Sequence, residues 1–127
     1  MKYSIFKESK YHNKQTTYDG YKFASLKERN YYIKLKMMQN SGKISDLKLQ
    51  PKYLLIDTIH YKNKTYPKTY YIADFQYYSK EDNKIHVVDV KSEATRKDKV
   101  YRLKIKMLLN KYPDVDFEEI LWYNVIV

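Results

Sequence analysis

Two carboxylates and a lysine in two β-rich stretches have the chemistry to cleave a phosphodiester. Asp74 lies in the stretch YIADF, and Asp89 and Lys91 lie two positions apart in the stretch IHVVDVKS. Side chains of a strand alternate between its two faces, so Asp89 and Lys91 would share one face. Two nearby carboxylates favour a hard divalent cation such as Mg²⁺ or Mn²⁺, and a lysine ammonium stabilises negative charge that develops at phosphorus.

Whether the two carboxylates meet depends on the loop between their strands. If the four residues KEDN (80–83) close an antiparallel hairpin, Asp74 lies directly opposite Asp89, with the Cβ atoms about 4.5–5.5 Å apart. A two-residue loop would place Asp74 opposite Lys91, and a loop with an odd number of residues would separate the acids. A cation would remove the repulsion between the two acids. The alternative is a pair of solvated acids bonded to nearby lysines.

The pattern around these residues predicts one α/β domain over residues 1–127, with a basic arm and hairpin over 1–24 and a core over 25–127. Asp19-Gly20 lies between two short β-favouring runs and predicts a type I′ hairpin. Strands are predicted over 49–59, 69–79 and 84–92, with a last strand within 115–125.

Two segments, 25–43 and 98–113, carry apolar residues at helical spacing. Gly42 is the expected C-cap of the first helix, and Pro113 ends the second. The apolar faces are Leu26, Ile33, Leu35, Met37 and Met38 in the first helix, and Val100, Tyr101, Leu103, Ile105, Met107, Leu108 and Tyr112 in the second. The second helix joins two strands, so the crossover rule makes the last strand parallel to the third and adjacent to it. We expect helix, three strands, helix, strand, in a four-stranded mixed sheet of order 1-2-3-4 flanked by helices.

The composition favours a polyanionic partner and excludes several classes of site. Lys and Arg number 25 against 15 Asp and Glu, a net charge of +10 that suits nucleic acid. An AT-rich genome is an alternative origin, since only three of the 25 are Arg. The absence of cysteine excludes thiol nucleophiles, and no glycine-rich nucleotide loop is present. Without a signal peptide or a membrane span, we expect a soluble, cytoplasmic protein with no membrane partner.

YIADF, followed fifteen positions later by VVDVKS, resembles the Asp…(Asp/Glu)-x-Lys signature of the PD-(D/E)XK nuclease superfamily, with Ala73 in place of the motif's proline. The ordered set KFASLKERNYY, LQPKY, YIADF and DVKS is similar to a family of small phage-encoded domains of unknown function usually placed in that superfamily. The resemblance spans about residues 12–110. It implies a restriction-endonuclease-like core, with Asp74 and Asp89 as ligands of Mg²⁺ or Mn²⁺ and Lys91 as the residue that positions the attacking water and stabilises the transition state.

The resemblance also implies a third metal-ligating acid at Glu28. The alternative is a capping box, because Ser25 stands three residues before Glu28 at the start of the first helix. Candidate DNA-binding residues are Gln50, Lys97, Lys104, Lys10 and Lys14. Gln50 recurs in the resembling family, whereas the lysines of the second helix and of the arm could equally form a solvated face and a loose tail.

These features together predict a metal-dependent DNA endonuclease that derives from a phage or a mobile element. A chain this short leaves little room for a module that reads sequence, so we expect a structure-specific enzyme acting on branched DNA, similar to a Holliday-junction resolvase. Cutting two strands would require a symmetric homodimer. The alternatives are a catalytically inactive nucleic-acid-binding module and a phage protein that inhibits a host nucleic-acid enzyme.

Overall fold

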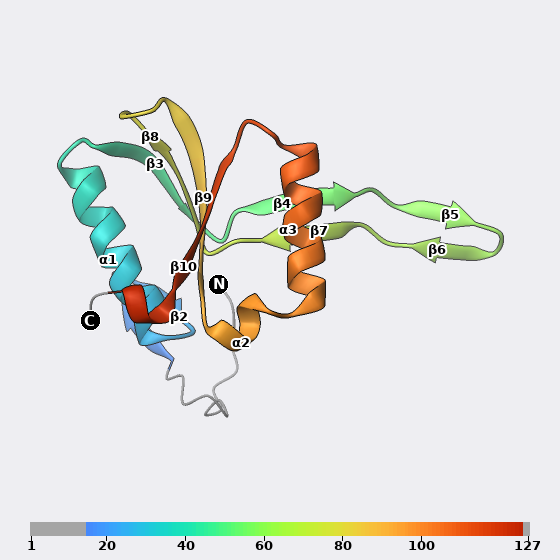
Figure 1. Cartoon of the computed structure of the whole chain (residues 1–127), viewed down its shortest axis with the longest axis horizontal. Coiled ribbons are helices and arrows are strands. Elements are labelled where there is room, and N and C mark those ends of the chain that lie inside the picture. Colours follow the sequence, from blue (N-terminus) through green and yellow to red (C-terminus); the bar gives the residue numbers. More distant parts are fainter. Residues whose placement is uncertain (1–14, 126–127) are drawn as a thin grey trace.

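A four-stranded mixed sheet forms the centre of the computed structural model, which describes residues 15–125 (Figure 1). Its strands are β3 (Ile44–Leu49), β8 (Phe75–Ser79), β9 (Lys84–Lys91) and β10 (Asp116–Leu121), in the order β10-β9-β8-β3. β10 runs parallel to β9, and the other neighbours are antiparallel. The mixed sheet and the parallel last strand are therefore confirmed. β10 lies within the range predicted for the last strand, and a 3₁₀ turn, η1 (Trp122–Asn124), follows it.

Helices cover both faces of the sheet. Successive residues of β9 point to opposite faces, so they belong to two different cores. Val88 and Val90 belong to the core under α1 (Leu26–Asn40), whereas Val87 belongs to the core under α3 (Lys99–Lys111). Figure 1 shows the two helices on either side of β9. A short helix, α2 (Glu93–Arg96), precedes α3 and was not predicted. Within the described residues, no helix has the length and apolar character needed to cross a membrane.

The N-terminal hairpin and the limits of the first helix agree with the prediction. β1 (Thr16–Tyr18) pairs with β2 (Tyr21–Phe23), and φ is 56° at Asp19 and 81° at Gly20, as a type I′ turn requires. α1 begins after the N-cap Ser25. Gly42, with φ of 85°, follows the end of α1, where the left-handed conformation favours glycine.

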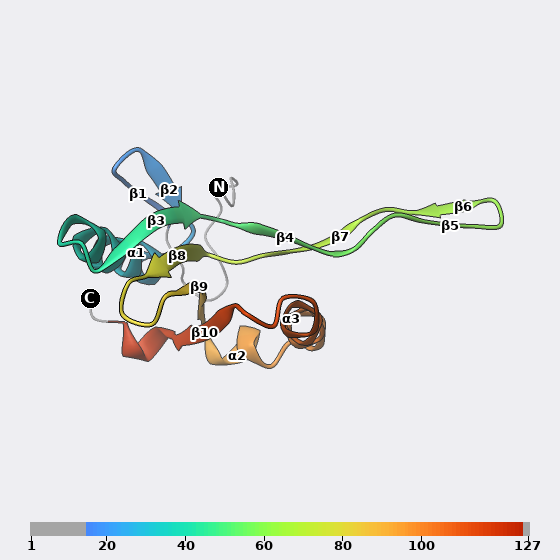
Figure 2. The same ribbon diagram turned by 90° about the horizontal axis from the view of Figure 1, so that it is seen from above.

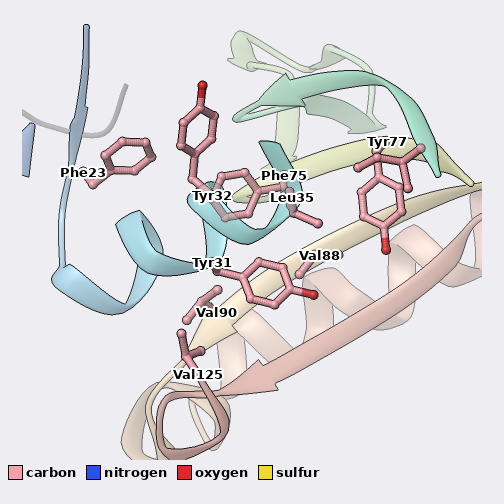
Figure 3. Close-up of a cluster of buried hydrophobic side chains, with 10 residues drawn as sticks. Phe23, Tyr31, Tyr32, Leu35, Phe75, Tyr77, Val88, Val90 and Val125 are labelled. Carbon is pink, nitrogen blue, oxygen red and sulfur yellow. The ribbon is translucent and has the colours of Figure 1, made fainter. Parts of the chain in front are cut away.

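The face of α1 that packs on the sheet differs in part from the predicted one: Leu35, Ile33 and Met38 do pack in the core. Tyr31, Tyr32 and Leu35 are buried, whereas Leu26 and Met37 are exposed. The rings of Tyr31 and Tyr32 lie 6.0 and 6.3 Å from the ring of Phe75 (Figure 3). Aromatic rings bury more surface than the aliphatic side chains of the predicted face, so the tyrosines set the rotation of the helix.

The predicted apolar face of α3 is too wide. Tyr101, Ile105, Leu108 and Tyr112 follow the i, i+4, i+7, i+11 spacing and contribute to one core. Val100 and Leu103, on the opposite side of the helix, are exposed. A helix packed on one face of a sheet buries a single stripe, which these four residues form together with Met107.

The predicted strand over 49–59 is wrong as a strand of the central sheet, because β3 holds that place and was missed. The chain beyond β3 forms a separate two-stranded ribbon. β4 (Lys52–Ile56) pairs with β7 (Thr69–Ile72), and β5 (Ile59–Tyr61) pairs with β6 (Lys64–Tyr66). From here on, this ribbon, residues 52–72, is called the arm; it is distinct from the basic N-terminal segment within residues 1–24. The β4–β7 half packs against α3, and the β5–β6 end extends away from the sheet and helices in both views (Figures 1 and 2).

The break between sheet and arm has a local cause in the backbone. Gln50 takes a left-handed φ of 53°, which is rare for a residue with a side chain, and Pro51 has no N–H to donate to a ladder. The predicted strand over 69–79 breaks opposite, at Ala73 and Asp74. Two hydrogen bonds join the breaks, from Gln50 N–H to Asp74 O (2.9 Å) and from Ala73 N–H to Pro51 O (3.2 Å).

Candidate functional site

The break between β7 and β8 holds Asp74 against the middle of β9. Its N–H donates to Val88 O (3.1 Å), and its Oδ2 accepts from the Val90 N–H (2.8 Å). The β8–β9 ladder ends with Phe75 opposite Val88, in the register set by a four-residue loop. The predicted loop is confirmed, and the next position along each strand is Asp74 on one side and Asp89 on the other. Asp74 is buried.

Asp89 is fully buried and held by two neighbours on its own face of the sheet. The Tyr71 hydroxyl donates to Asp89 Oδ2, and Lys91 Nζ lies 3.5 Å from Asp89 Oδ1. Oδ1 accepts no hydrogen bond from the part of the chain that the structure describes. Asp89 and Lys91 thus share one face, as strand alternation predicts.

Burial raises the pKa of Asp89 well above its usual range, and the charge of Asp74 raises it further, against the opposing effect of the Lys91 ammonium. Asp89 consequently resists ionisation unless a positive charge approaches. A divalent cation placed between the two carboxylates would supply that charge.

Asp89→Asn is expected to stabilise the metal-free protein at neutral and alkaline pH. The pKa of Asp89 is higher in the folded state than in the unfolded state. Protonated Asp89 therefore adds to the free energy of unfolding below the ordinary carboxyl pKa, and this contribution is lost as the pH rises through the pKa of the folded state. Asparagine cannot ionise and can still accept from Tyr71. Urea unfolding in chelator should give a gain on the order of 1–3 kcal/mol at pH 8, with a smaller gain at pH 5. A variant less stable at both pH values would show that ionised Asp89 is not strained.

The α3 side of the site contains a linked set of side chains that sequence reasoning missed. Lys91 Nζ lies 4.8 Å from the centre of the Tyr101 ring, and the Tyr101 hydroxyl donates to Glu119 Oε2 (2.5 Å). Glu119 faces Asp89 across the β9–β10 ladder and is paired with Arg96 (Nε to Oε1 3.2 Å). Burial raises the pKa of Tyr101, so its hydroxyl stays protonated as a donor. The crossover rule predicted that the last strand lies next to β9. It did not predict the register of the two strands, and that register places Glu119 beside Asp89.

Glu28 lies across a small cavity from Asp74, on the α1 side of the site. The cavity of about 10 Å³ is close to the space of one water molecule. It is lined by Lys22, Phe23, Glu28, Leu49, Gln50, Asp74 and Phe75. Asp74 therefore shares this cavity with Glu28 and is also the neighbour of Asp89 in the β8–β9 register. The Glu28 N–H also donates to Ser25 Oγ (3.1 Å), which is one half of a capping box.

The observed hydrogen bond of the cap uses the backbone of Glu28, so a substitution of its side chain tests the ligand role. Glu28→Gln keeps that N–H, so we expect unchanged urea unfolding and a roughly 10- to 100-fold loss of any metal-dependent activity. Ser25→Ala should do the opposite, with a loss of about 1 kcal/mol of stability and little change in activity. Unchanged activity in Glu28→Gln would assign Glu28 to the cap alone, because glutamine serves a capping box as glutamate does.

The candidate DNA-binding residues are dispersed. Gln50 lines the Glu28–Asp74 cavity, and Lys97 lines a surface recess of about 480 Å³ between α2, α3 and β10, together with Arg96 and Arg102. Lys104 is half-buried on α3 and does not line that recess. Lys10 and Lys14 lie outside the described residues.

Two carboxylates of the site are available as ligands for a hard divalent cation. Asp74 and Asp89 supply two adjacent carboxylates, and the buried Oδ1 of Asp89, which has the Lys91 ammonium at 3.5 Å but accepts no hydrogen bond from the described residues, is an acceptor that a cation would satisfy. Within residues 15–125, no three acidic or histidine side chains converge into a ready-made cage. Mg²⁺ commonly binds through one or two carboxylates and keeps several waters, so two carboxylates are sufficient.

Comparison of the chain with curated proteins and with solved structures finds no match. A family profile does match, and it covers residues 8–123, which include every described element up to the 3₁₀ turn. The chain therefore belongs to the family described as protein of unknown function (DUF1064).

Proposed function

We propose that this chain is a Mg²⁺- or Mn²⁺-dependent DNA endonuclease of the PD-(D/E)XK type, built on a restriction-endonuclease-like core and derived from a phage or a mobile element. One observation carries the proposal. Two buried carboxylates, Asp74 and Asp89, lie side by side beside the break between β7 and β8, and Lys91 lies 3.5 Å from Asp89 on the same face. The net charge of +10 supports DNA as the partner.

Asp74 and Asp89 would hold the cation, and Glu28 would complete or relay its shell across the cavity. When bound, such a cation polarises the phosphate and lowers the pKa of water. Tyr71 orients Asp89 through its hydroxyl, and Tyr101 flanks the Lys91 side chain. Lys91 would position the attacking water and stabilise negative charge developing at phosphorus. Hydrolysis of this type would leave a 5′-phosphate.

The substrate that we propose is branched DNA, such as a four-way junction formed in recombination, cut by a symmetric homodimer in the cytoplasm of the host cell. The domain is small, and the described part of the chain contains no separate module that reads sequence. An inactive nucleic-acid-binding module and an inhibitor of a host nucleic-acid enzyme are the competing functions, and neither explains why two acids are buried together beside a lysine.

The test is cleavage of matched labelled substrates: linear duplex, single strand, flap and four-way junction, each with Mg²⁺, with Mn²⁺ and with chelator. We expect metal-dependent cutting, fastest on the junction. Cutting that favours linear duplex would keep the nuclease and overturn the choice of substrate. Binding to DNA in chelator with no cutting under any condition would favour the inactive binding module.

A further inference from the structure

The arm ends in a tip, residues 57–68, that packs on nothing in the described chain. Every residue from 59 to 68 is exposed, including Ile59, Tyr61 and Tyr66 at 51, 60 and 50%. Figures 1 and 2 show the tip far from the sheet in two perpendicular views. A two-stranded ribbon is marginally stable alone, and large apolar side chains at its free end favour contact with a partner.

The root of the arm is anchored, so the direction of the tip is set relative to the candidate site. Lys111 Nζ and the Tyr112 hydroxyl both donate to Leu54 O (3.0 and 2.9 Å), and the Tyr53 ring meets the Tyr112 ring edge-on at 5.3 Å. At the other end of the root, the Gln50 N–H donates to Asp74 O. The root of the arm is therefore joined directly to the backbone of Asp74.

The chemistry of the tip fits a polyanion. Three lysines, Lys62, Lys64 and Lys68, accompany a single acid, Asp57. Ile59 pairs with Tyr66 and Tyr61 pairs with Lys64, so the aromatic and apolar side chains share one face with a lysine. Lys62 Nζ lies 5.4 Å from the centre of the Tyr61 ring. An excess of positive charge opposes pairing of the tip with a second copy of itself.

We propose that the arm grips duplex DNA beside the cleavage site by entering a groove of the double helix. The inference rests on the proposed function for its choice of DNA as the partner. The major groove admits a two-stranded β-ribbon, and lysines at the tip would meet the flanking phosphates. Lys62 is twelve residues from Asp74 along the chain, so at about 3.4 Å per residue the tip reaches about 40 Å, slightly more than one helical turn.

The test compares two triple variants of equal charge change in the full chain. Lys62→Asn, Lys64→Thr and Lys68→Thr remove the tip lysines, with asparagine chosen because φ at Lys62 is 54°. Lys43→Thr, Lys80→Thr and Lys84→Thr remove three exposed lysines around the β8–β9 loop. Fluorescence anisotropy in chelator measures binding to duplexes of about 30 and about 10 base pairs, three turns and one turn. Far-UV spectra and urea midpoints check that both variants fold.

We expect the tip variant to bind the long duplex about 10- to 100-fold more weakly, with a salt slope smaller by about 2 to 3, and to bind the short duplex like the wild type. Equal loss in both triple variants, or equal loss on both duplexes, would overturn the proposal. A tip variant that changes from dimer to monomer in sedimentation, with unchanged DNA affinity, would assign the arm to a second copy.

The outcomes separate this proposal from the nuclease proposal. If the tip variant loses affinity for the long duplex while the wild type cuts no substrate, the arm proposal stands and the nuclease proposal fails. If the wild type cuts DNA and the tip variant binds normally, the reverse holds. A wild type that binds neither duplex would overturn the arm proposal, and cleavage of the four-way junction would still decide the nuclease proposal.

Discussion

Replacing Asp89 with asparagine is expected to lower metal-dependent cleavage of DNA by about 10³-fold or more, because a bound cation contributes several kcal/mol of charge stabilisation and about 4 kcal/mol corresponds to that factor. The substitution keeps the size of the side chain and its acceptor for the Tyr71 hydroxyl. DNA binding in chelator should stay unchanged. Single-turnover cleavage with saturating Mg²⁺ measures the effect, and Asp74→Asn should give a similar loss.

The matched control is Asp46→Asn, which makes the same change of charge at an exposed position on β3. Asparagine tolerates the left-handed φ of 56° at Asp46, so this variant should fold and cut like the wild type. Asp89→Asn that cuts at the wild-type rate would overturn the metal-ligand role. Equal losses in all three variants would point to net charge as the cause.

The raised pKa of Asp89 gives the same prediction a second readout. Protonated Asp89 is a poor metal ligand, so at low Mg²⁺ the cleavage rate should rise with pH through a value above the ordinary carboxyl range. Higher Mg²⁺ competes with the proton and should move this rise to lower pH. A midpoint that does not move with Mg²⁺ would dissociate the titrating group from the cation.

The relative position of Asp74 and Asp89 could be predicted from sequence because it depends only on the number of residues in the loop and on strand alternation. The four residues of the loop 80–83 set the β8–β9 register, and strand alternation puts Asp89 and Lys91 on one face. The parallel position of β10 follows from a chirality rule that does not depend on side chains. Each of these inferences uses local periodicity or topology alone.

Other features depend on contacts between segments that are distant in the sequence, and they could not be predicted from local patterns. The left-handed backbone at Gln50 turns what looked like one sheet strand into β3 and the arm, and nothing in the local composition marks that conformation. Burial of Tyr31 and Tyr32 in place of Leu26 and Met37 reflects the fit of α1 against Phe75. The Tyr101–Glu119–Arg96 set needs the β9–β10 register, which no turn fixes.

The irregular stretch is also where the candidate site lies. In an unbroken strand from β7 to β8, the backbone of Asp74 would pair in a regular ladder, and its side chain would lie on a flat surface of the sheet. The break instead frees Asp74 Oδ2 to accept from Val90 N–H and places Gln50 and Glu28 around the same cavity. Departures from regular backbone of this kind collect at functional sites, where surrounding structure compensates for the strain.

Replacing Lys91 with methionine is expected to lower the maximal cleavage rate by about 10²- to 10³-fold, the usual effect of losing one group that stabilises charge in the transition state. Methionine retains the apolar part of the side chain beside the Tyr101 ring and removes the ammonium. The Lys91 charge also opposes the rise in the pKa of Asp89, so the variant should need a higher pH before Asp89 ionises. The pH–rate profile at several Mg²⁺ concentrations measures both effects.

Those two effects distinguish a catalytic lysine from one that only neutralises Asp89. A lysine that acts on Asp89 alone would be replaced by high pH and saturating Mg²⁺, and Lys91→Met would then recover the wild-type rate. A lysine that contacts the reacting phosphate would leave a defect of about 10²-fold under the same conditions. Lys84→Met, at the exposed end of the same strand, is the matched control and should show neither the lost rate nor the altered pH profile.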